Sequence, residues 1–269
     1  MALLGHGDAV GGVVNIILRR DFEGHESRLR VGAARGGAED LIAAHTVGRR
    51  WSDGNALLSY EYQDQGSLNS ADRDYTATGD LRPFGGTDRR TFYGAPGTIV
   101  VSGPGGAFVP QFAIRPNAGG TATTPADFVS GTNLGNNRAG LDLIPEQQRH
   151  SVYGLVRQDL TDGVEVSADL RFSERDFGID STAPLTVARV TSANPFFVSP
   201  NGSASHQIAY SFARDLGSSR REGNSRSLGI SAGADIALGS GWRADLYGAY
   251  ALERSENRQT GLLNSTFVQ

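Results

Sequence analysis

The sequence predicts an antiparallel, all-β fold, and three observations support this prediction. Apolar and polar residues alternate along several stretches, short and long connections alternate between those stretches, and long amphipathic helical patterns are hard to find. Successive side chains of a strand point to opposite faces, so an alternation of period two gives a strand with one apolar and one polar face. Several of these stretches are longer than the usual globular strand of about five or six residues.

The clearest predicted strand is VEVSADLRF at 164–172, in which every second residue is apolar and the residues between them are charged or polar. The same pattern predicts strands at 227–238 and 242–252, and further ones at 27–35 and 56–64. Segments 40–50 and 150–160 also fit strands, but apolar residues occupy both of their faces, so their orientation stays open. The chain therefore contains about seven predicted strands.

The connections between these strands indicate the architecture. The turns WSDGN, TDG and GSG are tight, whereas the links on the other side are GGAE and two long segments, about 65–147 and about 176–225. Loops of that length are unusual in a compact soluble domain but expected on the extracellular side of an outer-membrane β-barrel. We therefore expect an up-and-down transmembrane β-barrel segment with two long extracellular loops. Aromatic residues near the predicted strand ends fit interfacial girdles: Trp51, Trp242, Tyr60, Tyr62, Phe172 and Tyr250.

Composition excludes several classes of function. The net charge is −4, and all 25 basic residues are arginine, so nothing favours a nucleic-acid partner. The absence of cysteine excludes disulfides and thiolate metal sites, and the five histidines lack metal-ligand spacing, so we expect no cofactor. No apolar run reaches the ~18 residues of a membrane helix, and the N-terminus lacks a signal-peptide pattern. Those two features alone favour a soluble, cytosolic protein, an interpretation that requires the chain to be complete.

The glycine-rich stretch GHGDAVGGVVNII raises the question of a phosphate-binding loop. A dinucleotide fingerprint places its glycines after a strand and before a helix, because the pyrophosphate sits on the helix N-terminus. Here the glycines precede a β-branched stretch without helical period, so the phosphate-loop interpretation fails.

The same stretch resembles the end of the plug domain of TonB-dependent outer-membrane receptors. The family often has Gly-Ser before the aspartate where this chain has His6-Gly7, and DLIPEQQRHSVYGLV is also similar to receptors of this family. Glycines allow the turns of such a junction, so its role is structural. The resemblance divides the chain into the C-terminal end of a plug domain at 1–24 and the N-terminal part of a barrel at 25–269. Gly7 belongs to the structural motif, and the matching residues are Asp8, Ala9, Val10, Gly11, Gly12, Val13, Val14, Asn15, Ile16 and Ile17.

The resemblance implies a function in transport. Barrels of this family have 22 strands and a plugged lumen, so about seven strands indicate an internal fragment that is not expected to transport alone. The intact protein is expected in the outer membrane of a Gram-negative cell, surrounded by outer-membrane lipid. It would bind a scarce nutrient (a ferric siderophore, cobalamin, haem or an oligosaccharide) and import it with energy from the TonB complex. It would perform no chemistry on that nutrient, so we expect no enzyme and no catalytic residues.

The family binds its ligands partly through the extracellular loops, which makes loop aromatics and arginines the candidates here. The simpler interpretation of each is an ordinary loop residue. On the predicted polar face, we expect Arg171 with Asp169, and Arg243 with Asp245, to balance charge rather than contact a ligand. The loop candidates are Phe84, Arg89, Arg90, Phe92, Tyr93, Phe196, Phe197 and Tyr210.

Two other classes of protein remain as alternatives. A surface adhesin or autotransporter fragment would share the alternation but would not need the glycine-rich junction. A soluble β-sandwich, such as a carbohydrate-active domain, would need a thick apolar core and carboxylates placed for acid–base catalysis, and no isolated acidic pair occurs. Solubility separates a soluble enzyme domain from the receptor fragment. The enzyme domain should be soluble when expressed, whereas a sheet with long unpaired edges tends to aggregate.

Overall fold

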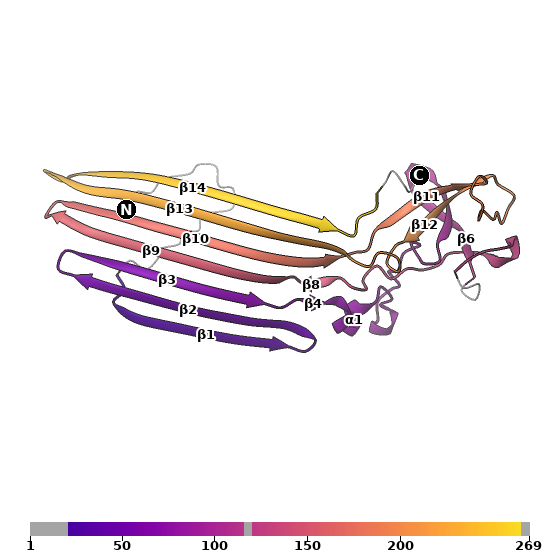
Figure 1. Cartoon of the computed structure of the whole chain (residues 1–269), viewed down its shortest axis with the longest axis horizontal. Helices are drawn as coiled ribbons and strands as arrows, with labels where there is room; N and C mark the ends of the chain where they lie inside the picture. Colours follow the sequence, from indigo (N-terminus) through magenta and orange to yellow (C-terminus); the bar gives the residue numbers. More distant parts are fainter. Residues whose placement is uncertain (1–20, 116–119, 265–269) are drawn as a thin grey trace.

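A computed structural model describes residues 21–115 and 120–264, and these residues form an antiparallel, all-β fold. Seven long strands run up and down in sequence order and form one curled sheet (Figure 1). The predicted glycine-rich junction lies outside the described residues. The seven strands are β1 (Gly24–Ala34), β2 (Gly37–Trp51), β3 (Gly54–Gln65), β9 (Glu146–Thr161), β10 (Val164–Ser181), β13 (Ser219–Gly239) and β14 (Trp242–Thr260).

These strands confirm the seven that alternation predicts, but β10, β13 and β14 each extend eight or nine residues further at the loop side. β10 continues to Ser181 and β13 begins at Ser219, so the second long connection is 182–218, shorter at both ends than the predicted segment of about 176–225. The alternation ends at Phe172 because charged residues then occupy both faces. There the pairing is held by the backbone ladder and by cross-strand contacts such as that of Arg226 with Glu174. The first long connection is 66–145, close to its prediction.

Both long loops contain regular structure that the sequence did not predict. Their strands form a five-stranded sheet in the order β11-β12-β5-β6-β7, beyond the loop ends of the long strands (Figure 1). We call it the loop sheet. Its strands are β5 (Thr98–Ser102), β6 (Phe108–Ile114), β7 (Phe128–Ser130), β11 (Leu185–Thr191) and β12 (Ser205–Ser211). The remaining loop elements are β4 (Leu68–Asn69), β8 (Asp142–Ile144), α1 (Asp74–Ala77), and the 3₁₀ turns η1 (Ser70–Asp72), η2 (Arg82–Phe84), η3 (Pro104–Gly106) and η5 (Pro125–Asp127).

Strand register settles the two orientations that the sequence left open. Val152 of β9 lies opposite Phe172 and Tyr60, and Val47 of β2 lies opposite Leu58, so these residues belong to the apolar face. Opposite residues of an antiparallel pair share a face. We call this apolar side the outward face and the opposite side, which carries Asp169 and Arg171, the inward face.

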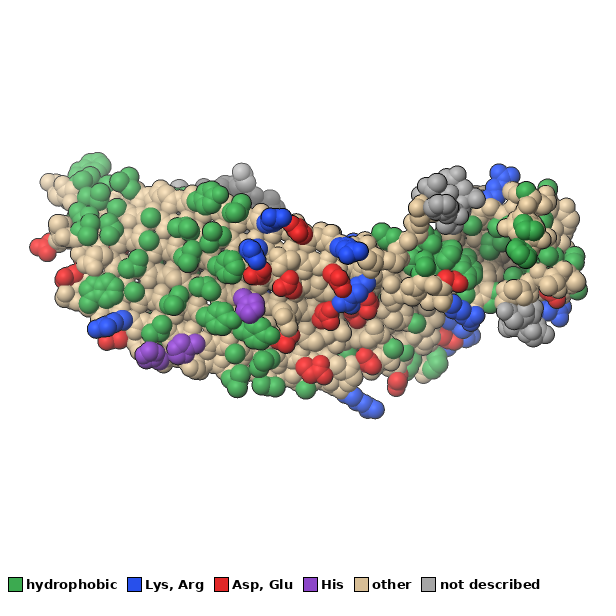
Figure 2. Space-filling view, viewed as in Figure 1, with side chains coloured by type: hydrophobic (Ala, Val, Ile, Leu, Met, Phe, Trp, Pro, Cys, Tyr) green, Lys and Arg blue, Asp and Glu red, His purple; other side chains and the backbone are tan. Residues whose placement is uncertain are grey.

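The outward face is apolar but exposed. Leu29 and Val31 are 71% and 72% exposed, and Leu246 is 61% exposed at the far side of the sheet. Figure 2 shows apolar side chains gathered over the turn half of this sheet and charged side chains gathered over its loop half. Most of the fully buried side chains lie instead in the loop sheet, where Val100 is 2% exposed and Ala209 is 0% exposed. The long sheet is therefore held by its hydrogen-bonded ladder and leaves a broad apolar surface uncovered.

The long sheet is an open arc in the part of the chain that the structure describes. β1 pairs with β2 alone, and β14 pairs with β13 alone, so each outer strand presents an unpaired edge. The structure therefore confirms an all-β, antiparallel fold with a curled sheet of half-barrel shape, which does not close among the described residues.

Candidate functional site

The inward face of the long sheet neutralises its charges in pairs over the turn half. Arg171 Nε lies 3.1 Å from Asp169 Oδ1, and Arg243 Nε lies 3.4 Å from Asp245 Oδ1, so both predicted pairs are confirmed. Arg157 adds a third pair, because its Nη2 lies 2.6 Å from an oxygen of Glu165. These arginines balance neighbouring carboxylates and leave little net charge on this part of the wall.

The segment that precedes β1 approaches this same inward face. Asp21 Oδ1 lies 3.6 Å from Arg50 Nη2 and 3.7 Å from Arg157 Nη1, and both arginines face inward. The carbonyl group of Phe22 lies so close to Gly48 of β2 that no side chain could be accommodated there. The chain therefore enters the sheet along its inward face.

The two long loops are joined in one unit. β12 of the second loop pairs with β5 of the first, with Ala209 opposite Thr98, and both residues are fully buried. Asn133 fastens the start of β5 to the end of β6, because its side-chain amide donates to the carbonyls of Gly97 at 3.4 Å and Ile114 at 3.0 Å. The loops thus form a packed sheet that can hold side chains in fixed positions.

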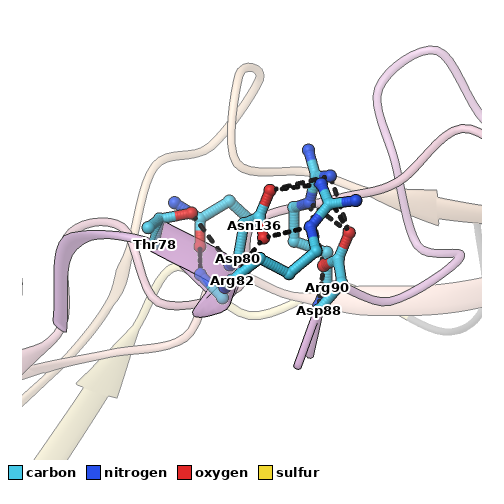
Figure 3. A network of polar contacts seen from close by, with 7 residues as sticks. Thr78, Asp80, Arg82, Asp88, Arg90 and Asn136 are labelled. Carbon is cyan, nitrogen blue, oxygen red and sulfur yellow. Dashed lines mark hydrogen bonds and ion pairs between the residues drawn. The ribbon is translucent and has the colours of Figure 1, made fainter. Parts of the chain in front are cut away.

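Arg90, one of the predicted ligand residues, belongs to a closed network of charges (Figure 3). Its Nη2 lies 2.7 Å from Asp88 and 3.4 Å from Asp80, while Arg82 lies 2.6 Å from Asp80 and 3.5 Å from Asp88. The backbone reinforces this arrangement, since Asp80 and Asp88 pair as an isolated antiparallel bridge. Arg90 therefore stabilises the loop, and its charge is already satisfied.

The network lowers the pKa values of its two carboxyl groups. Side-chain and backbone hydrogen bonds from Arg90 hold the pKa of Asp88 at about 2, and hydrogen bonds from Arg82 lower the pKa of Asp80. Both groups are therefore ionised at neutral pH, as the network requires.

The structure brings together three of the other predicted residues. The rings of Phe92 and Tyr93 stack with their centroids 4.7 Å apart, and the next residue, Gly94, forms a parallel bridge with Tyr210 of β12. The Tyr210 hydroxyl donates to Asp215 at 2.8 Å, and its ring meets Phe212 edge-on. Burial, followed by the interaction with Asp215, raises the pKa of Tyr210. Aromatic residues from both loops thus adjoin where the loops meet.

The remaining predicted residues do not join this group. Phe196 is 88% exposed and Phe84 is 52% exposed. The ring of Phe197 instead stacks on His206 at the start of β12, with centroids 5.4 Å apart. Within the part of the chain that the structure describes, Arg89 forms no ion pair, and its backbone N–H donates to Gly79 at 2.7 Å.

Sequence reasoning missed the residues that shape this loop unit. Asp80 and Asp88 each lie two positions before an arginine, and this repeated Asp-x-Arg spacing was a local signal for paired charges. No comparable local signal marks His206, which lines a cleft of about 380 Å³ between β5 and β12. Burial lowers the pKa of His206, and its Nε2 lies 3.0 Å from the Ser199 hydroxyl.

A second, open groove of about 700 Å³ lies at the loop ends of β9, β10, β13 and β14. Its central cation is Arg220, which forms ion pairs with Glu222 at 2.7 Å, Asp180 at 3.4 Å and Glu146. These three carboxylates neutralise the charge of Arg220, so this arginine is not available to bind an anionic ligand in the groove.

No family model, curated protein or solved structure matches the chain. Among residues 21–115 and 120–264, no group of three or more His, Asp or Glu side chains is placed to hold a metal ion. The same residues contain no helix that is both long enough and apolar enough to cross a membrane.

Proposed function

We propose that the chain is part of a TonB-dependent outer-membrane receptor, comprising the end of its plug and the first strands of its barrel. The observation that carries this proposal is the continuous apolar outward face of the long sheet. Exposed apolar side chains cover it from β1 to β14, including Leu29, Leu58, Ile230 and Leu246. Monomeric soluble proteins rarely expose a contiguous apolar surface of this extent.

The height of the apolar face fits a bilayer. On β14 it runs from Trp242 to Leu252, which are ten positions apart, and residues such as Arg254 and Glu256 follow on the same face. At about 3.3 Å per residue this stretch is about 33 Å long. A strand tilt of about 40° reduces that length to about 25 Å, the height of the apolar band of outer-membrane barrels.

The rest of the molecule is consistent with a receptor. The inward face is charged, the chain enters along that face through Asp21, and both long loops lie on the side opposite the short turns. In the proposed receptor, β1 and β14 pair with further strands, because lipid does not satisfy an open sheet edge. Residues 7–17 would end the plug, the loops would meet the nutrient, and the TonB complex would supply energy. The nutrient would be a siderophore, cobalamin, haem or an oligosaccharide.

A labelling experiment tests the membrane part of the proposal. The chain has no cysteine, so single cysteines report without background. Tyr250→Cys faces outward and the neighbouring Ala249→Cys faces inward at the same depth. In the chain refolded into liposomes, we expect a fluorophore at position 250 to be quenched by nitroxide lipids, and one at 249 by a water-soluble quencher. Equal quenching at the two positions would contradict a lipid-facing sheet.

Uptake measurements test the transport part. In the organism that carries the gene, its deletion should abolish uptake of one radiolabelled nutrient, and deletion of TonB should abolish the same uptake. An adhesin would instead lose surface attachment while all uptake rates remain unchanged. A soluble enzyme would be recovered from the soluble fraction and would not show the alternating lipid exposure.

A further inference from the structure

Two arginines face each other near the loop end of the inward face. Arg149 of β9 lies directly opposite Arg175 of β10, on the face that carries Asp169 and Arg171. Like charges placed directly opposite on neighbouring strands destabilise a sheet. This arrangement is therefore unfavourable for the wall unless something neutralises it.

The wall itself does not neutralise this pair. In the described ranges 21–115 and 120–264, neither Arg149 nor Arg175 forms an ion pair, although inward arginines nearer the turns pair with Glu165, Asp169 and Asp245. Glu61 lies one step along the sheet, opposite Ser151, and makes no ion pair with Arg149. The charge balance of the inward face is therefore interrupted at this pair, whereas Arg30, in the same row of opposite residues, has Asp40 as its partner.

Neutral polar side chains flank the two guanidinium groups along their row of opposite residues. The row of opposite residues continues from Arg175 to Ser225 and Ser255, and Gln63 lies opposite Arg149 on the other side. Hydroxyl and amide groups can donate hydrogen bonds to an anion without competing for it as a carboxylate would.

Both guanidinium groups are held in position. Arg149 Nη2 donates to Gln63 Oε1 at 2.6 Å, while its Nε–H is buried without an acceptor. Arg175 lies over the ring of Phe177, with its guanidinium carbon 4.9 Å from the centroid, a distance that suits a cation–π contact. Phe177 lies across Gly223, where an added Cβ would stand 2.7 Å from the ring. The two guanidinium groups are thus held in position but retain hydrogen-bond donors without acceptors.

We propose that Arg149 and Arg175 form a subsite for the carboxylate or phosphate group of a small-molecule ligand. Arginine binds such groups through two parallel hydrogen bonds, and a donor left buried without a partner gains most from a charged acceptor. The inference rests on the proposed receptor function and narrows its ligand to a nutrient that carries an acidic group.

Equilibrium dialysis of the full chain in maltoside micelles tests this subsite, because such micelles contain no lipid phosphate. The probes are radiolabelled citrate and inorganic phosphate, with trimethyl citrate as the uncharged comparison. Arg175→Ala removes one side of the subsite from an exposed position. Arg171→Ala is the matched control, because it removes an inward arginine of the same strand that already has a carboxylate partner.

We expect citrate or phosphate to bind the unaltered chain and trimethyl citrate not to bind. Arg175→Ala should weaken anion binding about tenfold, while Arg171→Ala leaves it within about twofold. Arg175→Lys should recover only part of the affinity, since lysine lacks the planar fork. Equal binding by the chain and its Arg175→Ala variant, or no anion binding at all, would overturn the subsite. The alternating lipid exposure at positions 249 and 250 would be unaffected by that result, so it separates a failed subsite from a failed receptor proposal.

Discussion

The side chains of Asp80, Arg82, Asp88 and Arg90 form a closed set of ion pairs within the first long loop. Arg90 has the residue type and loop position of a ligand contact, yet its contacts are with this loop itself. A residue type thus suggests a role, and the partners of that residue decide it. Arg175 is the opposite case, because it lies in a strand and forms no ion pair in the described part of the chain.

The charge network makes the loop sensitive to acid. The pKa of Asp88 falls from 3.8 in an unstructured chain to about 2 in the fold, because Arg90 donates hydrogen bonds to the carboxylate. A lowered carboxyl pKa contributes stability that is complete above the unfolded value and is lost as the pH falls through the folded value. We expect the 79–90 segment to stay closed above about pH 4 and to open progressively toward pH 2. Hydrogen exchange of peptides from this segment, followed by mass spectrometry, measures the opening.

Substitution separates this effect from general acid unfolding. Asp88→Asn should accelerate exchange of the 79–90 segment severalfold at pH 7 and remove most of its further acceleration at low pH. Asp74→Asn, in the same loop but outside the network, should change neither. Identical exchange in both variants would show that the ion pairs do not hold this segment closed.

At the scale of elements, the pairing of β5 with β12 decides whether the two long loops behave as one unit. Val100 is 2% exposed in β5, whereas its neighbour Val101 is 45% exposed. Val100→Ala should destabilise the loop sheet by about 2 kcal/mol through lost burial and the cavity left behind. This is about a thirtyfold increase in the exchange rate of amides in both β5 and β12.

Val101→Ala is the matched control, because it removes the same atoms from the exposed side of the same strand. We expect it to leave the exchange of β12 nearly unchanged. Faster exchange of β5 with no change in β12 after Val100→Ala would mean that the loops open independently.

The sequence predicts the seven long strands because each spans a wall that is apolar on one side. Alternation at Val164 to Phe172 is a local consequence of that environment, and the tight turns supply the order of the strands. The same reasoning loses the strand ends, because beyond Phe172 polar residues face both sides. It also leaves β2 and β9 without an orientation, since Ile42 and Leu155 are apolar residues on the inward face.

The loop sheet follows from contacts that no local pattern encodes. β5 and β12 pair through residues such as Val100 and Gln207, which are separated by more than a hundred positions. Of the predicted ligand residues, the structure brings Phe92 and Tyr93 near Tyr210, assigns Arg90 to the charge network and leaves Phe196 apart. The paired arginines of the inward face were equally hidden, because their meeting depends on the register of β9 against β10.

For the whole molecule, the central feature is that the long sheet exposes its apolar face, whereas the loop sheet contains most of the fully buried side chains, among them those of Thr98, Val100 and Ala209. A soluble protein would instead bury the apolar face of its larger sheet against other elements. A bilayer reverses the preference, because lipid is the favourable environment for the outward face and water for the inward one. Under the proposed membrane location, we therefore expect the fold to be stable as a whole only where both environments are present.

If lipid covers the outward face and water the inward face, a charge added to one strand should destabilise the fold only on the outward side. Leu246 lies near the middle of the outward band of β14 and Tyr247, its neighbour, faces inward at the same depth. Both side chains are well exposed, at 61% and 84%, so neither substitution removes a packed core contact. An arginine on the lipid side of a barrel costs about 2–4 kcal/mol at the bilayer midplane.

We therefore expect Leu246→Arg to lower the free energy of unfolding from liposomes by about 2–4 kcal/mol, and Tyr247→Arg to change it by less than about 1 kcal/mol. Urea titration followed by tryptophan fluorescence measures both, since Trp51 and Trp242 lie at the turn end of the band. In lipid-free buffer the difference between the two variants should disappear, because water solvates the added charge on either face. If the outward face contacted another protein rather than lipid, Leu246→Arg would lower the free energy of unfolding only when that protein was present. A penalty that appears in liposomes without any partner protein therefore identifies the bilayer as the environment of this face.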